Sequence, residues 1–421
     1  MAAARDELPV TRQPRILVWG FTALLCAAMT ACGSPASKSA AHLQVSPATG
    51  RYDTPWDITV TGLTPNHAVA LGATTKGVGG NIFVSTASFT SDSRGTLDLA
   101  TVAPSSGSYS GAHSQGLLWS LRCAGCVYVL NPPTGGYQVT LTVTVDGAVV
   151  ATTQTTRLLS DPGVTRREER PATAGFYGDY FSGASGGPPR PALVIFGGSN
   201  GGLDDLDPEA ALLASHGYPT LDLAYFAEPG LPQTLLNIPL EYFATALTWL
   251  SRQPGVDASR MVVQGASRGS EAALLLGVHF PHLVHGVIAL VPNDAALCSF
   301  PGCGGPAWTL HGSRIPYTSL FNDPAPSDQP DAVIPVERIE GPILLDCGGH
   351  DQVWNSCAFA AAIQARLVSS PFTHALLDYP DAGHDVGFPA PYLPLGDRSE
   401  PDALARIDQW PHLLDFLSHL Q

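Results

Sequence analysis

The stretch Met-Val-Val-Gln-Gly-Ala-Ser-Arg-Gly at residues 261–269 determines the expected architecture of the carboxy-terminal half of the chain. Residues 261–264 are typical of a buried strand, and residues 271–279 are typical of a helix. Gly-x-Ser-x-Gly between a strand and a helix is the pattern of a nucleophile elbow, a sharp turn that exposes the serine hydroxyl. Gly265 and Gly269 leave room for that turn. We therefore predict that Ser267 is a nucleophile at a strand end.

Strands and helices are expected to alternate on both sides of this turn. The predicted strands are 192–196, 220–224, 261–264, 286–291, 343–346 and 374–379, and the predicted helices are 208–216, 238–252, 271–279, 356–367 and 403–420. Such alternation predicts βαβ crossovers and a mostly parallel sheet flanked by helices. Functional sites in these sheets lie at the carboxyl ends of the strands.

A serine hydroxyl needs a base that removes its proton and an acid that orients the base. Asp351 follows the predicted strand 343–346, and His384 follows the predicted strand 374–379, so the order Ser, Asp, His is satisfied. Their neighbours His350 and Asp385 are the alternatives, because a shift of one position would exchange the roles.

Two backbone N–H groups should stabilise the oxyanion of the reaction. One belongs to Arg268, the residue after the serine, and the second to Gly198 or Ser199 in the glycine-rich loop 197–202. That loop is not a phosphate-binding loop, because no Gly-Lys-Ser/Thr follows it. The expected chemistry requires neither a metal nor an organic cofactor.

The amino-terminal half has a different pattern. Residues 57–61, 87–90 and 137–145 alternate apolar and polar side chains between turn residues, which indicates antiparallel strands with one buried face. We predict a β-sandwich over 43–160 and an α/β domain over 161–421, with the polar stretch 158–170 as the crossing between them.

The first 31 residues are predicted to be a secretory signal peptide. Arg12 and Arg15 precede an apolar run over 16–29 that is shorter than a membrane span. The run ends before Cys32 in a sequence that resembles the bacterial lipobox, so 1–31 is interpreted as a lipoprotein signal and 32–42 as a tether. Lipidation of Cys32 would anchor an exported protein to the membrane of a bacterial cell envelope. The alternative is cleavage near Ala31 with Cys32 incidental.

The remaining six cysteines support an oxidising compartment, because they form three close pairs. The predicted disulfides are Cys123–Cys126, Cys298–Cys303 and Cys347–Cys357. A zinc site at Cys123 and Cys126 is disfavoured, because no second ligand pair has matching spacing.

Composition excludes two broad classes of protein. With 44% hydrophobic and 14% charged residues, the 421-residue chain is too apolar to be disordered. Its net charge of −15 would repel a phosphate backbone, so no nucleic-acid partner is expected.

Several motifs together resemble the family of acyl-CoA thioesterases and bile acid-CoA:amino acid N-acyltransferases. They are the elbow 265–271, the stretches 237–243, 334–338 and 348–356, the pairs Gly383-His384 and Pro391-Tyr392, the segment 405–410, and, in the amino-terminal half, 107–109 and 116–121. The resemblance spans roughly residues 43–421.

This resemblance implies an immunoglobulin-like β-sandwich followed by an α/β-hydrolase domain, with Ser267, Asp351 and His384 as the triad. Acyltransferase members use cysteine as the nucleophile, so serine favours hydrolysis of an acyl thioester. Export puts acyl-CoA itself in doubt as the substrate. The alternatives are a secreted carboxylesterase or lipase acting on oxygen esters and a non-catalytic surface lipoprotein that binds an acyl ligand.

Overall fold

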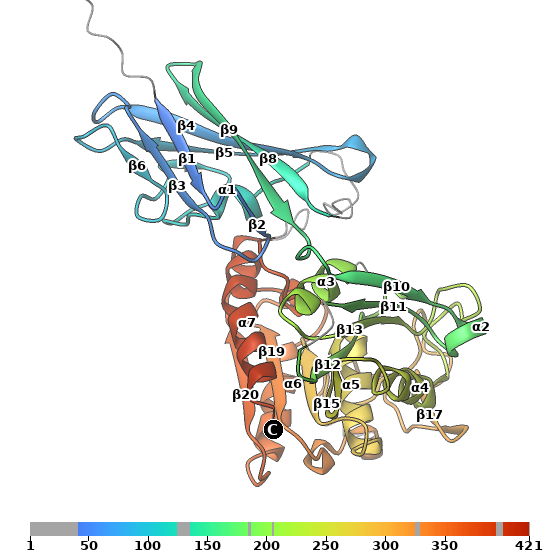
Figure 1. Ribbon diagram of the computed structural model, residues 1–421. Helices are drawn as coiled ribbons and strands as arrows, with labels where there is room; N and C mark the ends of the chain where they lie inside the picture. The colour runs from blue at the N-terminus through green and yellow to red at the C-terminus, as the bar shows by residue number, and fades with distance from the viewer. Residues whose placement is uncertain are drawn as a thin grey trace, which may run out of the picture. The chain divides into compact units, whose positions relative to one another are not determined.

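The computed structural model describes residues 41–123, 135–183, 187–203, 206–324, 329–392 and 399–420 (Figure 1). The chain divides into one unit over Met1–Ser39 and a compact unit over Ala40–Gln421. The predicted signal, Cys32 and most of the predicted tether therefore lie outside the described residues. Within the described residues, no helix is both long and apolar enough to cross a membrane.

The amino-terminal part of the compact unit contains two sheets. A six-stranded sheet has the order β2-β9-β8-β4-β5-β7, and a three-stranded sheet has the order β1-β3-β6. Their strands are β1 His42–Ser46, β2 Thr49–Arg51, β3 Asp57–Thr61, β4 Ala68–Lys76, β5 Ile82–Thr90, β6 Leu97–Asp98, β7 Ser106–Gly107, β8 Tyr137–Val145 and β9 Ala148–Leu158. Buried and exposed residues alternate along β3 and β5, as predicted for residues 57–61 and 87–90, and β4 alternates in the same way. One face of each strand therefore enters the core.

The carboxy-terminal part is built on an eight-stranded sheet with the order β10-β11-β13-β12-β15-β16-β19-β20 (Figure 1). Its strands are β10 Thr165–Glu169, β11 Tyr177–Ser182, β12 Arg190–Phe196, β13 Thr220–Ala224, β15 Val256–Ala266, β16 Gly286–Leu290, β19 Ile343–Gly348 and β20 His374–Tyr379. The strands from β13 to β20 in this order are parallel, whereas β10 and β11 are antiparallel to their neighbours. This is the strand order of an α/β-hydrolase fold, as predicted.

Helices cover both faces of this sheet. The main helices are α3 Asp207–Ser215, α4 Leu240–Leu250, α5 Arg268–His279, α6 Ser356–Arg366 and α7 Glu400–Ser418. Residues of α3 and α7 share a core with Leu193 and Val262, and residues of α4, α5 and α6 share another with Val194 and Val263. Successive strand residues therefore point into opposite layers, which explains their continuous apolar runs.

Short elements complete the described structure. They are α1 Gly116–Trp119, α2 Pro171–Ala174, the 3₁₀ turns η1 Val78–Gly80, η2 Pro330–Ala332, η3 Val336–Arg338 and η4 His384–Gly387, and the small sheet of β14 Ile238–Pro239, β17 Trp308–Leu310 and β18 Ser313–Arg314.

Some predicted boundaries differ from the structure. The polar stretch 158–170, interpreted as a crossing, contains the edge strand β10, whose Arg166 pairs with the buried Asp179 of β11. Charged side chains are typical of an edge strand, so this segment lacks the apolar pattern from which a strand would be predicted. The helix predicted within 238–252 extends from Leu240 to Leu250, and Ile238 and Pro239 before it pair with β17.

Candidate active site

The elbow forms as the sequence predicts. Ser267 lies between β15 and α5 with φ 56° and ψ −122°, a conformation that L-residues rarely adopt. A Cβ on Gly265 would lie 2.2 Å from Gly269 O, and one on Gly269 would lie 2.4 Å from Gly197 O. Only glycine therefore fits at both positions. Ser267 N donates a hydrogen bond to Leu290 O at 3.0 Å, which ties the elbow to the end of β16.

The glycine-rich loop after β12 approaches the serine directly. A Cβ on Gly198 would lie 2.8 Å from Ser267 Cβ, so this backbone contacts the nucleophile closely. The hydroxyl of the buried Tyr225 lies 2.9 Å from Gly197 O and 3.1 Å from Gly198 O, so both carbonyls share it as a donor. Tyr225, which the sequence analysis missed, thus fixes the orientation of the loop's peptide groups.

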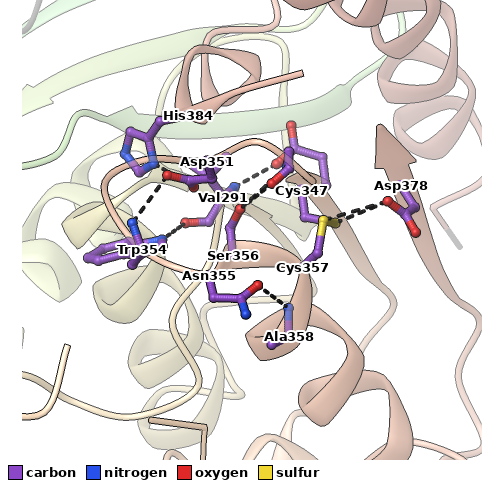
Figure 2. Close-up of a disulfide and its surroundings, with 12 residues drawn as sticks. Val291, Cys347, Asp351, Trp354, Asn355, Ser356, Cys357, Ala358, Asp378 and His384 are labelled. Atoms are coloured by element: carbon purple, nitrogen blue, oxygen red, sulfur yellow. Dashed lines mark hydrogen bonds and ion pairs between the residues drawn. A yellow bond between two sulfur atoms is a disulfide. The ribbon is translucent and has the colours of Figure 1, made fainter. Parts of the chain in front are cut away.

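The predicted acid and base meet at the ends of neighbouring strands. Asp351 follows β19, His384 opens η4 after β20, and His384 Nδ1 lies 2.8 Å from Asp351 Oδ2 (Figure 2). Asp351 Oδ1 also accepts hydrogen bonds from Val353 N at 2.8 Å and Trp354 N at 3.2 Å. The pair that makes contact is therefore Asp351 and His384, whereas the alternative base, His350, is exposed.

The environment of Asp351 favours its charged form. Burial raises the pKa of this carboxyl, but the hydrogen bond and charge of His384, together with hydrogen bonds from Ser356 and Val353, hold it below its usual value. Asp351 therefore remains ionised at neutral pH and can stabilise an imidazolium on His384.

Trp354 lies in the same loop as Asp351 and contacts both the imidazole of His384 and the backbone next to the serine. Its indole Nε1 donates to Val291 O at 3.1 Å, and its ring meets that of His384 edge to face with centroids 5.5 Å apart. Val291 immediately follows Leu290, which holds Ser267 N. In the sequence, Trp354 is recognisable only as part of a motif, because its role depends on contacts between distant segments.

The turn that carries His384 also packs beside the serine. A Cβ on Gly387, the last residue of η4, would lie 3.6 Å from the Cβ of Ala266, which precedes Ser267. The structure gives no hydrogen bond between Ser267 and His384, both of which it describes. Catalytic hydrogen bonds are often long without substrate, so this geometry is compatible with a triad.

A buried ion pair lies below the elbow. Arg268 Nε donates to Glu271 Oε1 at 2.6 Å, and the exposed fractions of the two side chains are 1% and 0%. Glu271 Oε2 accepts from Leu297 N at 3.1 Å and from Trp308 Nε1 at 2.9 Å. The pair therefore joins Arg268, the residue predicted to donate to the oxyanion, with residues 297–308. This role is not visible in the sequence, because Glu271 and Trp308 meet only in the folded chain.

A second carboxyl, Asp346, supports the backbone behind the site. It is fully buried in β19 and accepts a hydrogen bond from Val291 N at 2.6 Å and another from Gln409. Burial raises the pKa of Asp346 well above its usual value, although these two hydrogen bonds lower it. Asp346 lies within its strand and is not the partner of His384.

Two of the predicted disulfides are present, Cys298–Cys303 and Cys347–Cys357. Cys126 of the third predicted pair lies outside the described residues, whereas Cys123 lies inside them. In the described part of the chain, Cys347, Cys357 and Asp378 bring potential metal-ligand atoms within 4.8 Å of one another. Both sulfurs are bonded to each other, so neither is a thiolate that could ligate a metal.

The family models match both parts of the chain. The acyl-CoA thioester hydrolase/BAAT N-terminal region matches residues 53–171, and the BAAT/acyl-CoA thioester hydrolase C-terminal region matches residues 238–298 and 312–421. The chain belongs to this family. As a member of this acyl-CoA thioester hydrolase/BAAT family, it carries Ser267, Asp351 and His384 inside the C-terminal region.

Curated relatives are similar over nearly the whole chain. Human acyl-coenzyme A thioesterase 1 is 29% identical over 416 residues, covering 90% of this chain and 96% of that protein. Human mitochondrial acyl-coenzyme A thioesterase 2 is 28% identical over 418 residues, covering 90% of this chain and 84% of that protein. Mouse peroxisomal succinyl-coenzyme A thioesterase is 28% identical over 432 residues, covering 90% of this chain and 96% of that protein.

Solved structures are similar at lower identity. A protein described as a dienelactone hydrolase from Klebsiella pneumoniae is 15% identical with a TM-score of 0.45, covering 61% of this chain and all of that chain. A puromycin-hydrolysing peptidase of Mycobacterium tuberculosis is 14% identical with a TM-score of 0.44, covering 87% of this chain and 58% of that chain.

Proposed function

We propose that this protein is a serine hydrolase that cleaves acyl thioesters through Ser267, His384 and Asp351. The observation that carries the proposal is the contact of Asp351 with His384 at 2.8 Å. These two residues follow β19 and β20, and Ser267 follows β15 in an elbow of the same sheet. Membership of a family of acyl-CoA thioester hydrolases supports the substrate class.

In the proposed first step, Ser267 Oγ attacks the acyl carbonyl while His384 accepts the proton of the serine hydroxyl. The N–H of Arg268 and that of Gly198 or Ser199 stabilise the resulting oxyanion. When the bond to the leaving sulfur breaks, His384 returns the proton to the thiolate, and the acyl group remains on Ser267. A water molecule activated by His384 then attacks the acyl-enzyme and releases the carboxylic acid.

A direct test compares two leaving groups. The rate of thiol release from acyl-CoA esters of several chain lengths is measured beside p-nitrophenol release from matched oxygen esters, with Ser267→Ala as the blank. We expect a higher kcat/KM for thioesters and a loss of about 10⁴-fold or more in kcat for Ser267→Ala. Preference for oxygen esters would identify a carboxylesterase or lipase.

Labelling by a fluorophosphonate tests whether the serine reacts at all. The intact chain should be labelled at Ser267, and Ser267→Ala should not. If the intact chain is not labelled and no ester is hydrolysed, the proposal fails in favour of a protein that only binds an acyl ligand.

We also propose that the protein is exported and anchored through a lipid on Cys32. The support is the sequence of residues 1–32, together with two disulfides in the described structure, which suit an oxidising compartment. Mass spectrometry of the mature amino terminus from a bacterial host tests this proposal. A mature chain that begins at a lipidated Cys32 would support it, and a retained residue 1 or an unmodified Cys32 would contradict it.

A further inference from the structure

The Cys347–Cys357 disulfide closes the loop that carries the catalytic acid. Cys347 belongs to β19, Cys357 is the second residue of α6, and ten positions separate them in the sequence. Asp351 lies between them, in a stretch without helix or strand. Figure 2 shows the disulfide on one side of this loop and Asp351, His384 and Trp354 on the other.

Besides this bond, three hydrogen bonds join the loop to neighbouring segments: Gly349 N, His350 N and the indole of Trp354 donate to Tyr379 O, Ala382 O and Val291 O. Gln352, Val353 and Asn355 are exposed, and a cavity of about 330 Å³ lies along the loop. Asp351 is oriented by His384 and by the N–H groups of Val353 and Trp354, which belong to the same loop. At the base of the loop, Gly348 N donates to Ser356 Oγ at 3.3 Å, directly beside the two cysteines. The disulfide therefore fixes the span over which the acid-bearing turn must fold.

We propose that the Cys347–Cys357 disulfide is a positioning element for Asp351, so that turnover depends on its oxidised state. This inference rests on the proposed serine-hydrolase function. Opening the bond frees the loop between β19 and α6, and the carboxylate then spends less time in line with His384 Nδ1. A displacement of about 1 Å at a catalytic group can lower the rate about 100-fold.

The two sulfurs differ in access to a reductant. Cys347 is fully buried, whereas Cys357 is partly exposed. The thiolate of a dithiol such as dithiothreitol therefore attacks Cys357 Sγ. The S–S bond breaks, its electron pair goes to Cys347 Sγ, and that sulfur takes up a proton. The second thiol of the reagent resolves the mixed disulfide, giving two protein thiols and one cyclic oxidised dithiothreitol.

Asp378 makes that attack slower. Its Oδ1 lies 3.7 Å from Cys347 Sγ and 3.6 Å from Cys357 Sγ, and because disulfide sulfurs carry no hydrogen these are contacts rather than hydrogen bonds. A carboxylate at this distance repels an incoming thiolate. Asp378→Asn should therefore speed reduction by dithiothreitol and leave reduction by an uncharged phosphine less affected.

The test removes the bond by mutation and by reduction. The full chain and the Cys347→Ser/Cys357→Ser variant are assayed with p-nitrophenyl butyrate and labelled with a fluorophosphonate, below the melting temperature of each. Reduced samples are desalted without oxygen before assay, and mass spectrometry counts their free thiols. We expect kcat and the labelling rate to fall about tenfold or more, with KM changing less than about twofold.

Matched controls separate this disulfide from the other one and from stability. Reductant should not lower kcat of Cys347→Ser/Cys357→Ser any further, although that variant keeps Cys298–Cys303. The Cys298→Ser/Cys303→Ser variant should still lose activity on reduction. A bond that only stabilises the fold would lower the melting temperature and leave kcat unchanged at low temperature.

The outcomes distinguish this inference from the proposed function. If Ser267 of the oxidised chain is neither labelled nor able to turn over ester, the serine-hydrolase proposal is wrong. If Ser267 reacts, and removal of the Cys347–Cys357 bond changes kcat by less than about twofold, the positioning role is wrong while the hydrolase proposal stands.

Discussion

Glu271 illustrates how one buried side chain can control the residue beside a nucleophile. Both of its oxygens accept hydrogen bonds from N–H groups, those of Arg268, Leu297 and Trp308. Arg268 in turn donates to Leu297 O and Cys298 O at 3.3 and 2.8 Å. Because every partner is buried, the charge of Arg268 depends on Glu271 for compensation.

We expect Glu271→Gln to damage both stability and catalysis. An amide at this position turns an NH₂ group toward at least one of these donors and leaves a buried guanidinium without a counter-charge. This should cost about 3 kcal/mol or more of unfolding free energy. Denaturant unfolding and kcat measure the two effects. Glu241→Gln is the matched control, because Glu241 is 36% exposed and pairs only at the surface with His311. Equal stability of the two variants would contradict the role of Glu271.

At the scale of elements, the glycine-rich loop between β12 and α3, which we propose supplies an oxyanion donor, is held by contacts rather than by regular structure. Tyr225 donates to its carbonyls, and Gly198 touches Ser267 with no space for a side chain. The position of the proposed donor therefore depends on these contacts.

Gly198→Ala should therefore lower kcat while the chain still folds. Its Cβ would lie 2.8 Å from Ser267 Cβ and 3.1 Å from Ala266 O, so the loop must move away from the serine. We expect a loss of about 100-fold in kcat with a smaller change in KM, measured with p-nitrophenyl butyrate. Gly187→Ala is the control, because a Cβ there meets nothing within 4 Å. An unchanged kcat for Gly198→Ala would remove this loop from the oxyanion site.

The sequence predicted those parts of the site that depend on local pattern. Asp351 and His384 could be found because each follows an apolar run, and parallel strands bring their carboxyl ends to one edge. Tyr225, Glu271 and Trp354 were not predictable as parts of the site, since their partners lie 28, 37 and 63 positions away along the chain. The strand β10 was missed because its charged side chains pair across the sheet edge instead of entering a core.

Across the whole molecule, buried carboxyls give opposite dependences on pH. The pKa of Asp351 is lowered in the folded chain, so its contribution to stability is present at neutral pH and is lost as the pH falls. Burial raises the pKa of Glu209 from 4.5 to about 7, although the hydrogen bond from Gln264 opposes the shift. The folded chain is therefore more stable when Glu209 is protonated.

We expect Glu209→Gln to stabilise the protein only as the pH rises. Below about pH 4.5 Glu209 is neutral in both states, whereas between about 4.5 and 7 it ionises first in the unfolded chain, which favours unfolding by up to roughly 3 kcal/mol above pH 7. Glutamine keeps the oxygen that accepts from Gln264 Nε2 at 2.6 Å and never ionises.

The melting temperatures of Glu209→Gln and the unchanged chain, measured from pH 4 to pH 8, test this expectation. The two should nearly coincide at the acid end, and the variant should melt progressively higher toward pH 8. The exposed Glu337 supplies the control, because Glu337→Gln should shift the melting temperature by the same small amount at every pH. A difference between Glu209→Gln and the unchanged chain that does not vary with pH would mean that Glu209 has the same pKa in the folded and unfolded chains, which contradicts a shift caused by burial. The pH dependence of folding would then have to come from other groups.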